Sequence, residues 1–345
     1  MDNPFRLDFG AKPKLYIPRT VEENEVFNTF LAEESSTHLY MIIGARGMGK
    51  TVMMTSIAQR IEEKDGWIHI DLSSENVMQD FIVSLEDKCK SKLPRFNISV
   101  NMKVINLKIE PQEAQFSSIK VELDKILEKF KKDKIRLLIT IDEAVNSISM
   151  REFAIYFQQC LRKDFPVFVI LTGLFKNIRA LENNKSLTFL RRAEKINLKS
   201  LDSYRIAVEY RDTLNMNFDD AIEAAELIEG YSYAFQMLGY LLFKNNKLKI
   251  DKDICSELRY ALYEKSYEKI WEELSINEQK VCKEVARSDE SSLASHIKEA
   301  IGIDDNNYST YRHTLIKSGV LSTTAPRGKL EFALPFFNDF VLSML

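Results

Sequence analysis

The sequence is poor in the residue types that build disulfide frameworks and zinc sites. Its 345 residues include four cysteines and four histidines. The cysteines form no CxxC pair, and the histidines are equally scattered along the chain. A zinc site is therefore not expected, and the cysteines are predicted to be reduced thiols in a cytoplasmic protein.

Long apolar runs and an excess of one charge are also missing. The strongest apolar runs, Leu137 to Ile141 and Val167 to Leu171, are far shorter than a membrane span, so no membrane contact is expected. The acidic N-terminus lacks the apolar region of a signal peptide. The formal net charge of −3 gives no overall attraction to nucleic acid, so any basic surface must be local. The length suggests two or three domains.

One glycine-rich segment has the GxxxxGK[ST] spacing of a phosphate-binding loop. It follows an apolar strand and opens a segment of helical periodicity, as that motif requires. Glycines let the backbone N–H groups turn toward phosphate oxygens, and the helix N-terminus adds its positive dipole. Lys50 is predicted to reach the β- and γ-phosphates, and the Thr51 hydroxyl to ligate Mg²⁺. The predicted nucleotide-binding residues are Gly44, Ala45, Arg46, Gly47, Met48, Gly49, Lys50 and Thr51.

The apolar segment Leu137 to Ile141 runs directly into Asp142-Glu143. A buried strand places such residues at its carboxyl end, where ligands bind in open α/β sheets. We expect Asp142 to hold Mg²⁺, directly or through water, and Glu143 to act as the base for the attacking water. The two motifs together predict a nucleotide with Mg²⁺ as the ligand, and the family resemblance described below implies that this nucleotide is ATP or ADP.

Short apolar strands alternate with amphipathic helices through the first half of the chain. This order predicts a parallel sheet covered by helices on both faces, that is, an α/β P-loop core. Alternating residues near 96–110 predict a β-hairpin inserted into that core. From Lys195 onward the chain is expected to be mainly helical. Three helices followed by two short strands then give the order of a C-terminal winged helix.

Two further positions carry candidate catalytic groups. Thr172 ends the apolar strand Val167 to Leu171, where it could touch the γ-phosphate or the attacking water, or simply end the strand. Arg191 and Arg192 form a basic pair that could stabilise phosphate charge across a subunit boundary. The alternative for this pair is a solvated helix end beside Glu194.

Several segments, in this order, resemble prokaryotic ATP-binding proteins of the AAA+/STAND class, on the branch related to origin-recognition and cell-division-control initiator ATPases. Besides the phosphate loop and the acidic motif, the segments that carry the resemblance are Asn3-Pro4-Phe5 with Phe9-Gly10, Ile170 to Leu174, Phe189 to Leu198 and Gly230 to Gly239. The resemblance implies an ATPase core over 1–195, a helical lid over 196–264 and a winged-helix domain over 265–345. It also implies an inter-subunit arginine at Arg191 or Arg192, a sensor at Thr172, and a homo-oligomer as a possible assembly.

The chain departs from this family pattern at two places. It reads Pro18-Arg19-Thr20 where the family usually has Gly-Arg-Glu, and Ser232 to Gln236 lacks the arginine that initiator ATPases often carry in the lid. The first departure concerns contacts in the adenine pocket. Because the lid lacks that arginine, we expect ATP hydrolysis to ADP and phosphate to be slow, as suits a switch better than a motor.

The predicted winged helix leaves its partner open. Double-stranded DNA contacts are expected through Arg312, Lys317, Arg327 and Lys329. However, the segment 265–345 has ten lysines and arginines against twelve aspartates and glutamates, a net charge of −2. A nucleoprotein factor and a STAND-type signalling or defence switch whose tail contacts protein therefore remain as alternatives. A small-molecule kinase is disfavoured because the long helical C-terminus offers no obvious acceptor site.

Overall fold

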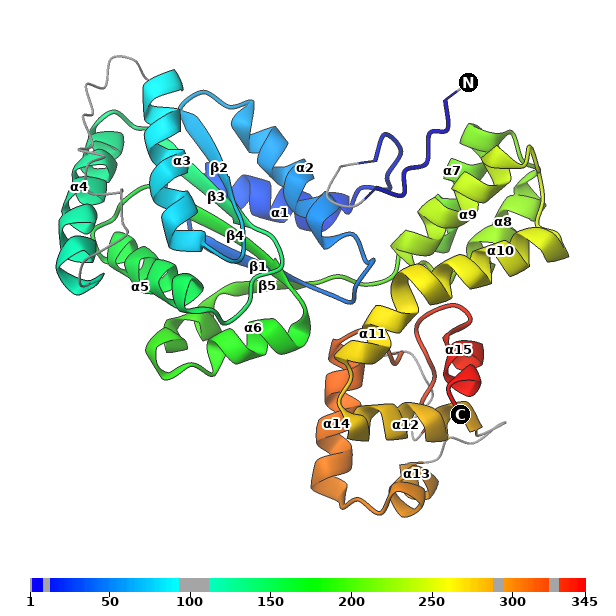
Figure 1. Cartoon of the computed structure of the whole chain (residues 1–345). Coiled ribbons are helices and arrows are strands. Elements are labelled where there is room, and N and C mark those ends of the chain that lie inside the picture. The colour runs from blue at the N-terminus through cyan, green and yellow to red at the C-terminus, as the bar shows by residue number, and fades with distance from the viewer. Residues whose placement is uncertain (1, 9–12, 93–111, 288–293, 323–328) are drawn as a thin grey trace.

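The computed structural model describes residues 2–8, 13–92, 112–287, 294–322 and 329–345 (Figure 1). Figure 1 shows a sheet with its covering helices, then a second group of helices, then a C-terminal group of helices beneath that one. We call these parts the core (α1 to β5, residues 20–197), the lid (α7 to α10, residues 203–262) and the C-terminal module (η3 to α15, residues 263–343). The predicted hairpin near 96–110 lies outside the described residues.

The core is built on five parallel strands in the order β2-β3-β4-β1-β5. Strands β1, β3 and β4 are almost wholly buried, because helices cover both faces of the sheet. This confirms the predicted α/β fold class. The strands are β1 (Leu39–Ile43), β2 (Trp67–Leu72), β3 (Arg136–Ile141), β4 (Val167–Gly173) and β5 (Glu194–Asn197).

Strand β5 was not expected, since this part of the chain was predicted to be mainly helical. Its four residues, Glu-Lys-Ile-Asn, bury only Ile196, so the segment has too little apolar pattern to indicate a strand. It forms by pairing with β1, from Tyr40↔Glu194 to Ile43↔Asn197. The sheet therefore extends past residue 195, the predicted end of the core.

Alternate residues of the strands pack into two separate clusters, one on each face of the sheet. Tyr40 and Ile42 of β1 pack with α1 (Thr20–Leu31) and α2 (Lys50–Glu62). Leu39 and Met41 face the other layer. That layer comprises α3 (Val77–Lys92), α4 (Gln112–Lys132), α5 (Ile148–Arg162), α6 (Phe175–Glu182) and the 3₁₀ segment η2 (Lys185–Arg192).

Three of the four lid helices, α7, α8 and α10, begin at the side-chain caps typical of helix N-termini. Asp202, Asn217 and Asp251 accept hydrogen bonds from the backbone N–H groups of Arg205, Asp219 and Ile254. The helices are α7 (Ser203–Leu214), α8 (Phe218–Leu227), α9 (Ser232–Lys244) and α10 (Lys252–Leu262). Their apolar faces form one continuous cluster with those of the C-terminal module.

The C-terminal module has the predicted order of three helices followed by two paired segments. Leu321 and Phe332 form an antiparallel bridge, and Ser322 N–H donates to Glu331 O at 2.8 Å. A final helix, α15, was not anticipated; it buries Phe337 and Phe340. The helices are η3 (Tyr263–Tyr267), α11 (Glu268–Glu273), α12 (Ile276–Arg287), α13 (Ala294–Ile301), α14 (Asp305–Lys317) and α15 (Phe337–Ser343).

Within the described ranges, none of the helices has the length and apolar character needed to cross a membrane.

Candidate nucleotide site

The predicted phosphate loop connects β1 to α2 at the carboxyl edge of the sheet. Gly47 and Gly49 adopt φ values of 76° and 86°, a left-handed conformation that a side chain disfavours. A Cβ added to Gly47 would lie 2.3 Å from the Tyr231 hydroxyl, so the loop also needs glycine there for close approach. Gly49 is the N-cap residue of α2, which places the helix N-terminus at the loop.

Lys50 is a buried cation directed at the loop. Its side chain is 7% exposed, and its Nζ donates to Gly44 O at 3.2 Å and to Ala45 O at 3.0 Å. Burial lowers the pKa of Lys50 to about 8, against the opposing effect of the Glu143 and Asp142 carboxylates. A desolvated ammonium held by carbonyl oxygens is well prepared to bind phosphate.

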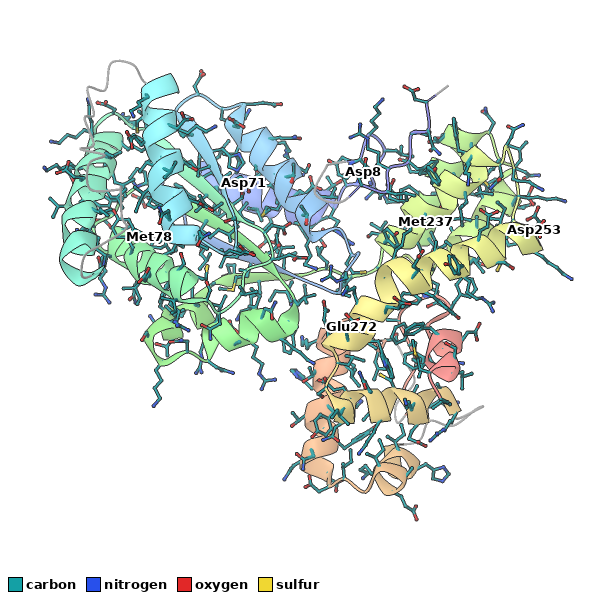
Figure 2. The ribbon with its side chains drawn as sticks, viewed as in Figure 1. Asp8, Asp71, Met78, Met237, Asp253 and Glu272 are labelled. Carbon is teal, nitrogen blue, oxygen red and sulfur yellow. The ribbon has the colours of Figure 1, made fainter. Side chains whose placement is uncertain are left out.

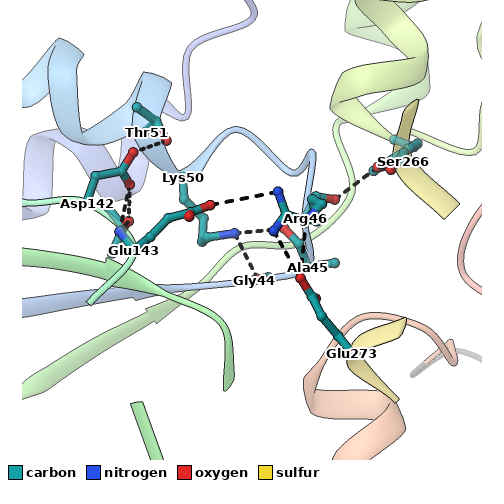
Figure 3. Close-up of polar contacts among 11 residues, drawn as sticks. Gly44, Ala45, Arg46, Lys50, Thr51, Asp142, Glu143, Ser266 and Glu273 are labelled. Carbon is teal, nitrogen blue, oxygen red and sulfur yellow. Dashed lines mark hydrogen bonds and ion pairs between the residues drawn. The ribbon is translucent and has the colours of Figure 1, made fainter. Parts of the chain in front are cut away.

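The acidic motif and the phosphate loop meet at Asp142 (Figure 3). Its Oδ2 accepts a 2.8 Å hydrogen bond from the Thr51 hydroxyl, and its Oδ1 accepts one from the Thr172 hydroxyl. The backbone N–H of Glu143 donates to Thr172 Oγ1 at 3.0 Å. Thr172 is fully buried, and its hydroxyl contacts both Asp142 and the backbone of Glu143.

Glu143 occupies a left-handed backbone conformation with φ of 51°, which is uncommon for a residue with a side chain. Its side chain is 60% exposed, and Oε1 lies 3.9 Å from Arg46 Nη1 of the phosphate loop. The turn directs the carboxylate of Glu143 toward the loop while Asp142 faces Thr51. The two adjacent acids therefore have different surroundings.

The donor set fits a magnesium ion better than a metal held by protein side chains alone. The Thr51 hydroxyl and the Asp142 carboxylate are hard oxygen ligands placed side by side. In the described part of the chain, no group of three or more histidine, cysteine, aspartate or glutamate residues is placed to hold a metal. Mg²⁺ with few protein ligands and with phosphate oxygens suits this geometry.

A pocket continues from the phosphate loop between the core and the lid, and both segments that depart from the family pattern contribute to its lining. Arg19 donates from Nη2 to Met48 O at 3.2 Å, and burial lowers its pKa. Ser232 of α9 donates to the same carbonyl at 3.1 Å. Although Pro18-Arg19-Thr20 departs from the family pattern, its arginine still lies at the pocket. The contact of Arg19 with the Met48 carbonyl is seen only in the structure.

The N-terminal segment joins the lid to the core along this pocket. Gln236 of α9 accepts from Arg6 N–H at 3.0 Å and donates to Leu15 O at 2.7 Å. Tyr16 hydrogen-bonds Ser56 of α2 at 2.8 Å. Figure 2 shows Asp8 between α2 and the lid. Gln236 lies within the lid stretch that lacks an arginine, and its side chain anchors this segment.

The structure does not bring Arg191 or Arg192 to the pocket. Both are exposed at the end of η2. Arg191 donates to Glu182 O at 3.1 Å and to Asn183 Oδ1 at 3.2 Å within its own chain. Neither is among the described residues that line the pocket. Of the predicted DNA contacts, Arg312, Lys317 and Lys329 are exposed, and Arg327 lies outside the described residues.

Comparison with known proteins agrees with this geometry. Residues 27–159, which hold the phosphate loop and the acidic motif, match the family model of the bacterial DnaA ATPase domain. Residues 264–341 match a domain of unknown function (DUF8462). No curated protein sequence matches the chain.

Solved structures share the fold over nearly the whole chain. The Walker-type ATPase paby2304 of Pyrococcus abyssi is 16% identical, with 95% of this chain and 96% of that one covered and a TM-score of 0.63. The ADP form of Aeropyrum pernix ORC2 is 13% identical, with 98% and 96% covered and a TM-score of 0.53. Cdc6p from Pyrobaculum aerophilum is 12% identical, with 98% and 96% covered and a TM-score of 0.51.

The sheet order, the phosphate loop and these likenesses define a Walker-type P-loop ATPase fold of the AAA+ class. It is related to the fold of the DnaA, Cdc6 and ORC proteins. The resemblance inferred from the sequence is thereby confirmed for the fold.

Proposed function

We propose that this protein binds ATP with Mg²⁺ and hydrolyses it slowly to ADP and phosphate. The observation that carries the proposal is the connected set Lys50, Thr51, Asp142 and Thr172 at the carboxyl edge of the sheet. The related Aeropyrum pernix ORC2 structure is described as an ADP form, which supports an adenine nucleotide.

Each residue of the site has a separate task. The loop N–H groups and Lys50 bind the phosphates, and Thr51 and Asp142 hold Mg²⁺. The bound ion supplies charge neutralisation at the phosphates. Glu143 accepts the proton of the attacking water, and Thr172 keeps Asp142 and the Glu143 backbone in place.

Slow turnover follows from what surrounds the site. Gln236 occupies the lid stretch where initiator ATPases often have an arginine, and its amide binds the N-terminal segment instead. We expect Arg191 or Arg192 to complete the site from a neighbouring copy, which makes hydrolysis depend on assembly. A nucleotide that stays bound then acts as a switch.

The partition into a core, a lid and a winged-helix module is part of the proposal. The module offers Arg312 and Lys317 on α14, with Lys329 after it, as exposed groups for DNA phosphates. On this helix the His313 ring packs against Phe175 of α6, with centroids 5.8 Å apart. Helix α14 thus contacts the core through His313 while Arg312 and Lys317 stay exposed.

The alternative is a STAND-type switch whose module binds a protein. The net charge of −2 over 265–345 favours it over a dedicated DNA-binding domain. Random duplex DNA at low and moderate salt, mixed with the ATP, ADP and nucleotide-free protein, distinguishes the two. Salt-sensitive binding that depends on nucleotide supports the DNA function. No binding in any nucleotide state excludes it and leaves the protein partner.

The ATPase proposal itself is tested by steady-state phosphate release with Mg²⁺ and with excess chelator. Release that requires both ATP and the metal supports it. Release that continues in the chelator contradicts the roles of Thr51 and Asp142.

A further inference from the structure

Arg46 of the phosphate loop makes its strongest polar contacts with the C-terminal module. Its Nη2 and Nε lie 3.0 and 3.3 Å from Glu273 Oε1. Glu273 is the last residue of α11, 227 positions further along the chain. The Nη1 of the same guanidinium lies 3.9 Å from Glu143 Oε1 (Figure 3). One cation of the nucleotide site is therefore shared between the proposed catalytic base and the module.

The end of α11 is held against the core by a second cation. Lys176 of α6 donates to Glu273 O at 2.9 Å and pairs with Glu278 at 2.6 Å. The Glu278 side chain is only 4% exposed and also accepts from Ser275 N–H at 2.7 Å. The position of Glu273 is thus fixed by contacts on both sides of the turn between α11 and α12.

Two further contacts bring the module to the loop. Gly319, with φ of 75°, approaches so closely that an added Cβ would lie 2.9 Å from Ala45 Cβ. Tyr231 donates to Arg46 O at 2.9 Å and hydrogen-bonds Ser266 of η3 at 2.7 Å. The phosphate loop is therefore contacted by the module as well as by the lid.

Glu273 places a negative charge beside the phosphate loop, where the phosphates of a bound nucleotide would add further negative charge. Its carboxylate acts on Arg46 directly and also favours the charged form of Lys50. Arg46 and Glu273 are about one-third exposed each, so either partner can be exchanged without unfolding a core. A guanidinium can bind phosphate oxygens with the same paired N–H donors that it uses to bind a carboxylate.

We propose that Arg46 is the residue that distinguishes ATP from ADP within one chain, and that Glu273 competes with the γ-phosphate for it. This proposal rests on the proposed function. When ATP is bound, Arg46 contacts the terminal phosphate and releases Glu273, so the module is held to the loop less tightly. ADP lacks the γ-phosphate and leaves the Arg46–Glu273 pair intact. By linkage, the docked module must weaken ATP binding by the same factor.

The test compares Glu273→Gln with Glu272→Gln, a matched control on the same helix. Glu272, labelled in Figure 2, is 64% exposed and pairs with Lys269 at 2.8 Å on its own helix. Glu273→Gln should bind ATP roughly threefold more tightly, as expected for a partly exposed charge pair, with little change for ADP. Glu272→Gln should match the wild type. In an Arg46→Ala background, the effect of Glu273→Gln should vanish.

Hydrogen exchange of the backbone amides in 263–274 reports on the docking of the module, and the comparison between variants can be made without nucleotide. Glu273→Gln should exchange faster than the wild type there, and ATP should speed exchange in the wild type more than ADP does. If Glu273→Gln equals Glu272→Gln in both ATP affinity and exchange, the competition is overturned. If the wild type binds no nucleotide while Glu273→Gln still speeds exchange, the proposed function fails and the docking contact stands.

Discussion

The Thr51 hydroxyl donates a 2.8 Å hydrogen bond to Asp142 Oδ2, although the two residues are 91 positions apart. Thr51 lies in the first turn of α2 and Asp142 directly follows β3, so the bond joins the phosphate loop to the acidic motif. Thr172, after a further crossover, binds the other oxygen of the same carboxylate. Groups from the first turn of α2 and from β4 thus meet at the one carboxyl group that follows β3.

Thr172→Val should lower turnover about tenfold while ATP affinity stays within about twofold, because the hydroxyl contacts Asp142 and the Glu143 backbone. Thr172→Ser keeps the hydroxyl and should retain most of the activity. Steady-state phosphate release and nucleotide titration measure the two effects. A large loss of ATP affinity in Thr172→Val would instead indicate direct contact with the nucleotide.

Glu143→Gln should bind ATP as the wild type does and lose at least about 100-fold in phosphate release, the usual effect of removing a general base. Gln keeps the size of the side chain and can keep a contact with Arg46. Single-turnover hydrolysis with enzyme in excess separates the chemical step from product release. Unchanged turnover would remove Glu143 from the mechanism.

Arg192→Ala should reduce activity only at protein concentrations where copies assemble, since neither arginine of the pair lines the pocket of its own chain. The same comparison with Arg191→Ala decides which of the two acts on phosphate. Phosphate release is measured across a dilution series with mass determined by light scattering. An equal loss in the monomer would assign the arginine a structural role or a role in its own site.

His38 predicts a pH dependence of stability. Burial, followed by the charge of Arg136, lowers its pKa in the fold, where the ring stacks on Phe168 at 4.5 Å. As pH falls through about 6.5, the unfolded chain takes up the proton first, so this stabilising contribution is present above that pH and lost below it. His38→Phe should lose less stability than the wild type between pH 7.5 and 5.5 in urea unfolding. His296→Gln, at an exposed position, is the control and should follow the wild type.

The sequence predicted those parts of the fold that depend on a local pattern of apolar residues or glycines. The strands β1 to β4 are short apolar runs, and the glycines of the loop signal their own backbone geometry, so the core and Lys50, Thr51 and Asp142 could be placed. Strand β5 escaped prediction because its formation depends on pairing with β1 rather than on its own residues. Helix α15 was not predicted because it is stabilised by aromatic side chains that pack on residues distant in the sequence, such as Phe337 on Tyr267.

The site residues that were missed depend on tertiary contact alone. Glu273 is one of many acids on an exposed helix, and nothing near it in sequence indicates that it reaches Arg46. Tyr231 and Ser232 of the lid contact carbonyl oxygens of the phosphate loop. The hydrophobic periodicity of a sequence does not predict such contacts between distant segments. For Thr172, strand position predicts the location, whereas its hydrogen bond to Asp142 is seen only in the structure.

The most direct test of the account is the affinity of the protein for ATP and ADP, measured by calorimetry with Mg²⁺ on the wild type and on Lys50→Ala. Thermal unfolding of both proteins first establishes that the variant is folded. The account predicts tight binding to the wild type and none to Lys50→Ala, because the phosphate-facing cation is gone. Micromolar ATP binding retained by a folded Lys50→Ala would contradict the assignment of the site.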